Sequence, residues 1–165
     1  MSSIASYFEA HLLEWLIGIF VVVLTWVGTN WVGKPLLEFL ADRQRTLEAL
    51  EVHGGISDRS SEERVKEAWK AIAEVAARMM FYAQGGPWIV RSYSRWRKYE
   101  LALVGRMLNG VHNFIGQNVA SATWKNQRDA VRFALGATNL MSVDRKEEIR
   151  AMVRKVLDAP AGEND

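Results

Sequence analysis

The sequence of 165 residues contains no cysteine and only three prolines. Without cysteine the chain has no disulfide, no thiolate metal site and no cysteine nucleophile, and its composition agrees with a reducing compartment. Few prolines and 24% charged residues are typical of an ordered globular protein rather than of a disordered one. The length allows one ordinary domain, or a small domain with an attached segment, but not two full-sized domains.

Charge is absent from a long stretch near the N-terminus, because residues 15–33 form a run of nineteen uncharged residues. At about 1.5 Å per residue, a helix of this length spans nearly the whole hydrocarbon core of a bilayer, which is roughly 30 Å thick. Trp15 lies at one edge of the run and Trp26 and Trp31 lie toward the other, as is typical of indole rings at the two membrane interfaces. We therefore expect a transmembrane helix over residues 15–33.

Two other interpretations of the apolar run stay open. It could form a buried helix or central strand of a soluble core, although a soluble core helix seldom has nineteen uncharged residues and usually has a polar face. It could also be a cleaved signal peptide. However, no positive charge precedes it, it is longer than the usual run of about 7 to 15 residues, and no A-x-A-like cleavage site closes it. We expect the segment to stay in the mature protein.

The positive charges next to the run predict its orientation. No Lys or Arg precedes it, whereas Lys34, Arg43 and Arg45 follow within about a dozen residues. Because positive charge is enriched on the cytoplasmic side, we expect the short N-terminus outside and the C-terminal part in the cytoplasm.

Small residues recur every four positions within the run, at Thr25, Thr29 and Gly33, with Asn30 beside them. Such a stripe allows two helices to approach closely, and an amide can form a hydrogen bond across the contact. A homo-oligomer through the membrane helix is one interpretation. The other is that these residues mark the interfacial end of the helix.

A helical pattern continues directly after the apolar run. Pro35 suits the first turn of a helix over about residues 35–52, which either continues the membrane helix or follows a turn at residues 33–35. Its apolar positions are Leu36, Leu37, Phe39, Leu40, Leu47 and Leu50. The polar residues Glu38, Asp42, Arg43, Arg45, Glu48 and Glu51 fill the rest. His53 and two glycines end this helix, and residues 56–59 are expected to form a linker.

Further helices are expected to the end of the chain. Ser60 and Glu63 have the spacing of a capping box and predict the start of an amphipathic helix that ends near Gly85. Its apolar stripe consists of Val65, Trp69, Ile72, Val75 or Ala76, and Met79. Residues 88–117 are expected to be helical with a break near Ser94 or Gly105, and residues 128–140 to form a shorter helix. The last helix begins at Asp144, ends at Pro160, and has a stripe of Ile149, Met152, Val153 and Val156.

No run of alternating polar and β-branched residues predicts a strand. The expected fold class is therefore all-α, with one N-terminal transmembrane helix followed by a small cytoplasmic helical bundle. The expected parts are a short non-cytoplasmic N-terminus (1–14), the transmembrane helix (15–33), a juxtamembrane helix and linker (34–59), a helical cytoplasmic domain (60–158) and a disordered tail (159–165).

Three segments carry a resemblance to a known group of proteins. They are KPLLEFL over residues 34–40, MFYA over residues 80–83, and NQRDAVR over residues 126–132 with Leu135 and Gly136. The pattern resembles small, uncharacterised bacterial proteins with one N-terminal membrane helix and a helical cytoplasmic domain. The chain departs from them in its tail after Gly136. The resemblance implies this topology in the bacterial inner membrane, and it implies no activity and no functional residues.

The near-neutral total charge of +2 hides a basic block over residues 75–143, which holds nine Lys and Arg against Glu100 and Asp129, a charge of +7. Within it, residues 88–99 read WIVRSYSRWRKY. On a helix, Arg91, Arg95 and Lys98 would share one face, with Ile89, Tyr93 and Trp96 on the other.

Such a segment can lie on an anionic membrane surface, or its aromatic residues can belong to an ordinary core beneath a solvated face. A third interpretation is nucleic-acid binding, for which no recognised motif is present. The residues expected to contact a membrane surface or a partner are Trp88, Arg91, Arg95, Trp96 and Lys98.

No pattern in the sequence indicates an enzyme. His11, His53 and His112 are far apart, and the chain has no Walker A loop, G-x-S-x-G or GxGxxG. Glu62, Glu63 and Glu67 lie near a helix start, where the helix dipole favours carboxylates without any catalytic role. His112 beside Asn113 could form a buried polar pair. We expect no catalytic residue, no metal site and no cofactor.

The sequence thus favours a non-enzymatic, single-pass membrane protein whose helical domain mediates interactions or scaffolding. Its expected partners are the lipid bilayer, a second copy through the membrane helix, and a protein that the sequence does not identify. Two alternatives of other classes are a membrane-tethered nucleic-acid-binding protein and a small membrane-linked enzyme without a recognisable motif.

Overall fold

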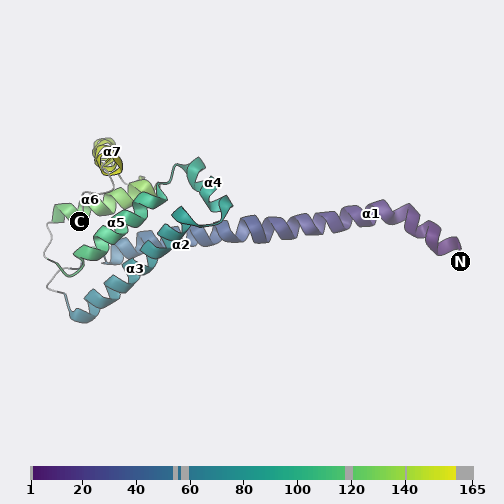
Figure 1. The fold of residues 1–165 in the computed structure, drawn as a ribbon, viewed down its shortest axis with the longest axis horizontal. Helices are drawn as coiled ribbons and strands as arrows, with labels where there is room; N and C mark the ends of the chain where they lie inside the picture. The colour runs from purple at the N-terminus through teal and green to yellow at the C-terminus, as the bar shows by residue number, and fades with distance from the viewer. Residues whose placement is uncertain (1, 54–55, 57–59, 118–120, 140, 159–165) are drawn as a thin grey trace. The chain divides into compact units, whose positions relative to one another are not determined.

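The computed structural model describes residues 2–53, 56, 60–117, 121–139 and 141–158. Within these residues the regular structure is entirely helical, which confirms the all-α fold class (Figure 1). The helices are α1 (Ser2–Val27), the π-helical turn η1 (Gly28–Gly33), α2 (Lys34–His53), α3 (Glu62–Gln84), α4 (Trp88–Arg97), α5 (Leu101–Phe114), α6 (Ser121–Ala134) and α7 (Val143–Asp158). The contacts divide the chain into two compact units, Met1–Glu38 and Phe39–Asp165.

The first unit contains a helix that is long and apolar enough to cross a membrane. Its most apolar stretch has a mean hydropathy of 2.0, and none of that stretch is buried. Apolar side chains such as Phe20 and Val22 are exposed around the helix. An apolar surface on all sides suits lipid better than water, because every exposed CH₂ group disfavours the aqueous state by about 0.8 kcal/mol.

Of the two arrangements expected after the apolar run, the helix continues into α2. The junction is π-helical: the backbone N–H of Lys34 donates to the carbonyl of Thr29, five residues earlier. Pro35 explains the change, since it has no N–H and its ring crowds the carbonyl four residues before it. A π-helical turn widens the backbone at such a position without ending the helix.

The second unit has its core around α5, which packs against both α3 and α6. Most of the buried side chains come from these three helices, among them Ile72, Met79, Leu103, Leu108 and Val131. α4 contacts α3, and α7 contacts α6.

The part of α2 that belongs to the second unit buries one stripe of side chains. They follow each other at steps of three and four residues: Phe39, Asp42, Thr46 and Leu50. Two of these positions differ from the sequence-based expectation, which placed Asp42 among the polar residues that fill the other face and gave Thr46 no position. The expectation that residues 34–59 form a separate juxtamembrane helix and linker stays a prediction.

The start of α3 differs from the predicted capping box at Ser60 and Glu63. The helix begins at Glu62, its N-cap is Ser61, and no side chain caps it. Along the predicted stripe, Ile72 and Met79 are buried as expected, but Trp69 is exposed. The helix ends at Gln84, which agrees with the predicted end near Gly85.

The break between α4 and α5 lies at residues 98–100, not at Ser94 or Gly105. Lys98 has a left-handed backbone with φ 57°. The N–H of Lys98 donates to the carbonyl of Arg95, and the N–H of Tyr99 donates to the carbonyl of Ser94. These two bonds form a Schellman motif, which usually has glycine at the left-handed position. Since a lysine occupies that position, the sequence carried no signal for the turn.

Gly105 lies inside α5 and has a packing role instead. It is buried, and a Cβ there would overlap the side chain of Met80. The missing side chain therefore allows α3 and α5 to approach closely.

α6 extends over Ser121–Ala134 rather than over the predicted residues 128–140. It ends in a second Schellman motif, in which Gly136 has φ +70° and the N–H of Ala137 donates to the carbonyl of Arg132. Two orphan carbonyls at this end find partners, since Ala134 accepts the N–H of Glu100 and Leu135 accepts Nε of Arg43.

α7 begins within one residue of the predicted start at Asp144, and its stripe residues Ile149 and Val153 are buried. The side chain of Val156 lies outside the described residues, as do most of the predicted linker (56–59) and the whole predicted tail (159–165).

Candidate functional site on helix α4

The most unusual exposed surface of the second unit is one face of α4. Trp88 is 60% exposed and Trp96 is 73% exposed. Arg91, Ser92 and Arg95 are exposed between them. At about 100° per residue these five side chains fall within a sector of about 140°, so they form one continuous face. The expectation that Trp96 lies on the face opposite the arginines was therefore wrong. We call these five residues the α4 face.

The opposite side of α4 belongs to the core. Val90 and Ser94 are buried, and Tyr93 is half-buried. The ring of Tyr93 lies edge-on to Phe39, with centroids 6.3 Å apart, and to Tyr99, with centroids 6.1 Å apart. The aromatic residues of this segment therefore divide into two sets, because the tyrosines pack in the core while the two tryptophans are exposed.

The two arginines of the α4 face have no ion pair in the part of the chain that the structure describes. By contrast, Arg78 pairs with Asp42 and Glu74, and Arg145 pairs with Asp129 and Glu148. Uncompensated cations on a helix with exposed indoles have the composition of a membrane-surface or phosphate-binding segment.

Lys98, the remaining predicted contact residue, is exposed but lies beyond the end of the helix. Its left-handed backbone means that it does not continue the row of Arg91 and Arg95 by helical spacing. Arg97 is held differently: its Nε donates to the hydroxyl of Tyr99 at 3.5 Å, and its guanidinium lies over the ring of Trp96. The bond to Tyr99 and the electrostatic effect of that tyrosine raise the pKa of Arg97.

A buried polar network fixes the region behind α4. Asp42 is buried, and its Oδ1 accepts from Arg78 at 2.8 Å and from Arg45 at 3.2 Å. Its Oδ2 accepts the hydroxyl of Tyr82 at 2.9 Å. The bond to Glu74, followed by the charge of Asp42, raises the pKa of Arg78. The carboxylate is thus paired and hydrogen-bonded, as a buried charge must be to be tolerated.

The stripe predicted for helix packing in the membrane lies in α1 and η1. The hydroxyls of Thr25 and Thr29 donate to the carbonyls of Val21 and Thr25, each at 2.8 Å. Asn30 donates to the carbonyl of Trp26 at 2.9 Å. Because the two threonine hydroxyls donate within their own helix, their contact with a second helix would depend on small side-chain size, whereas the amide oxygen of Asn30 can still accept a bond across such a contact.

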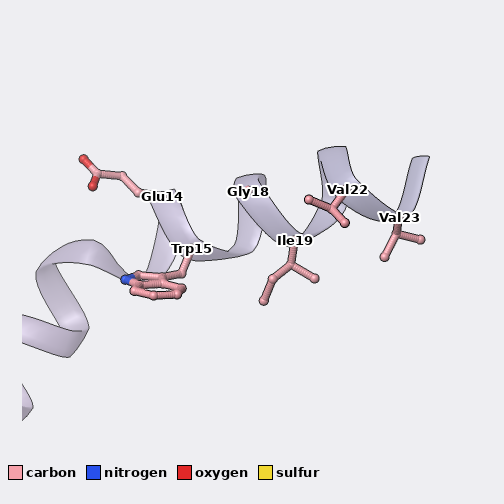
Figure 2. Close-up of a pocket in the computed structure, with 6 residues that line it drawn as sticks. All are labelled: Glu14, Trp15, Gly18, Ile19, Val22 and Val23. Carbon is pink, nitrogen blue, oxygen red and sulfur yellow. The ribbon is translucent and has the colours of Figure 1, made fainter. Parts of the chain in front are cut away.

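A second apolar surface of α1 lies nearer the N-terminus. It is lined by Glu14, Trp15, Gly18, Ile19, Val22 and Val23. Figure 2 shows Trp15, Ile19 and Val23 along one side of the helix. At Gly18 the surface is open, since a Cβ there would meet nothing within 4 Å. The lining has one charged group, at its end, so the surface suits lipid or another apolar helix.

The described residues contain no group of His, Asp and Glu suited to hold a metal ion. His112 and Asn113 do form a polar contact, with Nδ1 and Oδ1 3.5 Å apart, but the pair is not buried because Asn113 is exposed. The ring of His112 stacks on Trp69 with centroids 4.2 Å apart, and Nε1 of Trp69 donates to the carbonyl of His112. This contact ties α3 to α5 and explains the position of Trp69 outside the core.

The structure brings together four of the five predicted contact residues, Trp88, Arg91, Arg95 and Trp96, and leaves Lys98 at the helix end. Sequence reasoning missed Ser92, which completes the face, and it missed Ser94, whose burial only the packing of α4 reveals. Comparisons with protein-family models, with curated proteins and with solved structures find no match to this chain.

Proposed function

We propose that this protein is a single-pass membrane protein whose C-terminal helical unit is a non-enzymatic interaction or scaffolding module that rests on the cytoplasmic membrane surface through the α4 face. The observation that carries the proposal is the exposure of Trp88 and Trp96 on the same face as Arg91 and Arg95, which form no ion pair with any residue that the structure describes. The apolar helix of the first unit supplies the anchor.

The energetics favour such docking. Large exposed aromatic side chains are uncommon on soluble surfaces, and indoles are stabilised at the level of the lipid headgroups. Each cation near an anionic surface contributes about 1 kcal/mol. Tethering reduces the cost further, since the anchor holds the unit at a high effective concentration relative to the bilayer.

The proposed orientation places the N-terminus outside and the second unit in the cytoplasm, in the bacterial inner membrane. It is supported by the absence of Lys and Arg before the apolar run and by Lys34 directly after it. Since the chain has no native cysteine, single cysteines can be introduced for labelling. In intact cells, a membrane-impermeant maleimide should label Ser3→Cys and not Ala77→Cys. The reverse pattern would refute the orientation.

Docking of the α4 face is tested with the full chain in nanodiscs. A spin label at Ser92→Cys should be accessible to water-soluble nickel in discs of neutral phosphatidylcholine. In discs with about one third phosphatidylglycerol it should instead become accessible to oxygen, because the face has entered the headgroup region. A label at Ala77→Cys, which is exposed on α3, should stay in water in both kinds of disc.

Charge reversal provides the matched control for this experiment. Arg91→Glu with Arg95→Glu should keep the Ser92 label in water in anionic discs. Arg64→Glu with Arg154→Glu changes the total charge equally at exposed positions elsewhere and should leave the insertion unchanged. If the Ser92 label remains in water in anionic discs, or if both double variants act alike, the docking proposal is wrong. Release of insertion by an added oligonucleotide would point to nucleic-acid binding instead.

A further inference from the structure

A small hollow opens beside the α4 face, between the end of α3, α4 and the start of α5. It has a volume of about 170 Å³. The residues that line it are Tyr82, Ala83, Arg91, Ser94, Arg95, Tyr99, Leu101 and Ala102. The hollow is lined entirely from within the second unit.

The charge around the hollow is positive. Arg91 and Arg95, one helical turn apart, both line it, and no acidic side chain is among the lining residues that the structure describes. The carboxylate of Asp42 accepts the hydroxyl of the lining residue Tyr82 and is shared with Arg45 and Arg78. Within the described ranges, neither of the two lining guanidiniums forms an ion pair.

Two further groups at the hollow suit an anion. Ser94 is 97% buried, and its hydroxyl has no hydrogen-bond partner within the described residues. A buried hydroxyl without a partner is destabilising, so an acceptor nearby would be stabilising. The start of α5 also faces the hollow, through Leu101 and Ala102.

The start of α5 lacks a side-chain cap. Glu100 makes no capping bond, and the first helical hydrogen bond at this end runs from the N–H of Val104 to the carbonyl of Glu100. The N–H groups of the first turn are therefore not used by the helix itself, and together with the helix dipole they favour a negative group.

From these features we infer that the hollow binds a terminal phosphoryl group, held by the guanidiniums of Arg91 and Arg95, the hydroxyl of Ser94 and the first turn of α5. A phosphomonoester carries a charge of about −1.5 to −2 at neutral pH and offers three acceptor oxygens, which matches two arginines and additional donors. A volume of about 170 Å³ is well below the roughly 300–1,000 Å³ of sites that enclose a drug-sized ligand, so the hollow fits the phosphoryl group and not a whole nucleotide.

The group can come from phosphatidic acid in the membrane or from a soluble phosphate. The exposed Trp88 and Trp96 beside the arginines favour the lipid. Phosphatidic acid ends in a phosphomonoester, which carries a charge of about −1.5 to −2, whereas the phosphodiester of phosphatidylglycerol has a further substituent and less charge. This inference deepens the proposed function. Only the lipid source of the phosphate rests on that function, and the phosphoryl site itself does not.

Native mass spectrometry of the full chain in neutral detergent tests the site. With equal concentrations of phosphatidic acid and phosphatidylglycerol, the bound fraction of phosphatidic acid should be about tenfold higher, the difference expected for one additional charge-assisted interaction. Arg91→Gln with Arg95→Gln should weaken phosphatidic acid binding about tenfold or more, and Ser94→Ala should weaken it about threefold. Arg64→Gln with Arg154→Gln, the charge-matched control, should leave it unchanged.

Inorganic phosphate distinguishes the two sources. If it displaces phosphatidic acid at millimolar concentration, the shared phosphoryl chemistry is supported. If inorganic phosphate raises the unfolding temperature of the chain but phosphatidic acid binds no better than phosphatidylglycerol, the phosphoryl site is supported and its lipid source is refuted.

The inference is overturned if phosphatidic acid and phosphatidylglycerol bind equally and inorganic phosphate has no effect, or if the control variant loses binding as much as the Arg91 and Arg95 variant. Such a result would leave the proposed function intact if the spin label at Ser92→Cys still enters anionic nanodiscs. That insertion requires only a negatively charged surface and no phosphoryl site.

Discussion

Replacement of Asp42 by Ala tests whether the polar network behind α4 holds the second unit together. The carboxylate is 5% exposed and accepts hydrogen bonds from Arg45, Arg78 and Tyr82. Its loss removes one buried bond to a tyrosine and two bonds to cations that are partly exposed. The three bonds are therefore expected to contribute unequally.

The magnitudes follow from burial. A buried hydrogen bond to a charged group contributes about 1.5–3 kcal/mol, which applies to Tyr82. The bonds to Arg78 and Arg45, whose side chains are 42% and 62% exposed, are screened by water and contribute at most about 1 kcal/mol each. We expect Asp42→Ala to lower the free energy of unfolding by about 3 kcal/mol, Tyr82→Phe by about 2 kcal/mol, and Arg45→Gln by less than about 0.5 kcal/mol.

Urea unfolding of the full chain in nonionic detergent, followed by tryptophan fluorescence, measures these differences. The double variant of Asp42 and Tyr82 should be less destabilised than the sum of the single variants by about 1–2 kcal/mol, because both changes remove the same bond. If the effects of Asp42→Ala and Tyr82→Phe simply add, or if Arg45→Gln costs as much as Asp42→Ala, the reasoning from burial is refuted.

Two further outcomes are expected. Lys98→Gly should stabilise the second unit by about 0.5–1 kcal/mol in the same urea assay, since glycine adopts the left-handed backbone without strain. Lys98→Ala removes the charge but keeps the strain and should give no gain; equal stabilisation by both would assign the effect to charge. Arg145→Met should lower the stability by about 2–3 kcal/mol, because Arg145 donates twice to the buried Asp129. The fastest hydrogen exchange should then appear in α7, and unchanged protection there would contradict this prediction.

The parts of the fold that the sequence predicted correctly are those with strong local signals. The length and lack of charge of residues 15–33 were enough to predict a helix there. Helices α3 and α7 have apolar side chains at helical spacing and turn residues at their ends. Such signals depend on neighbours within one or two turns and need no knowledge of the tertiary structure.

The buried polar residues could not be predicted, because their burial depends on partners far away in the sequence. Asp42 is 36 residues from Arg78 and 40 from Tyr82, so its neighbours in the sequence do not reveal these partners. The same holds for Asp129, which is buried beneath Arg145 from another helix. A polar residue at a stripe position, such as Asp42 three residues after Phe39, is the one available sequence signal.

The arrangement at the candidate site depends on the single turn at Lys98. The sequence predicted a break near Ser94 or Gly105, and a helix without a turn at Lys98 would place Leu101 about 10 Å along the axis from Ser94. In the structure the Schellman motif ends α4 before residues 98–100, and the start of α5 lines the same hollow as Ser94 and Arg95. The residues of the basic-aromatic segment were therefore predictable from composition, but the hollow was not, because the turn beside it has a lysine at the left-handed position that glycine usually occupies.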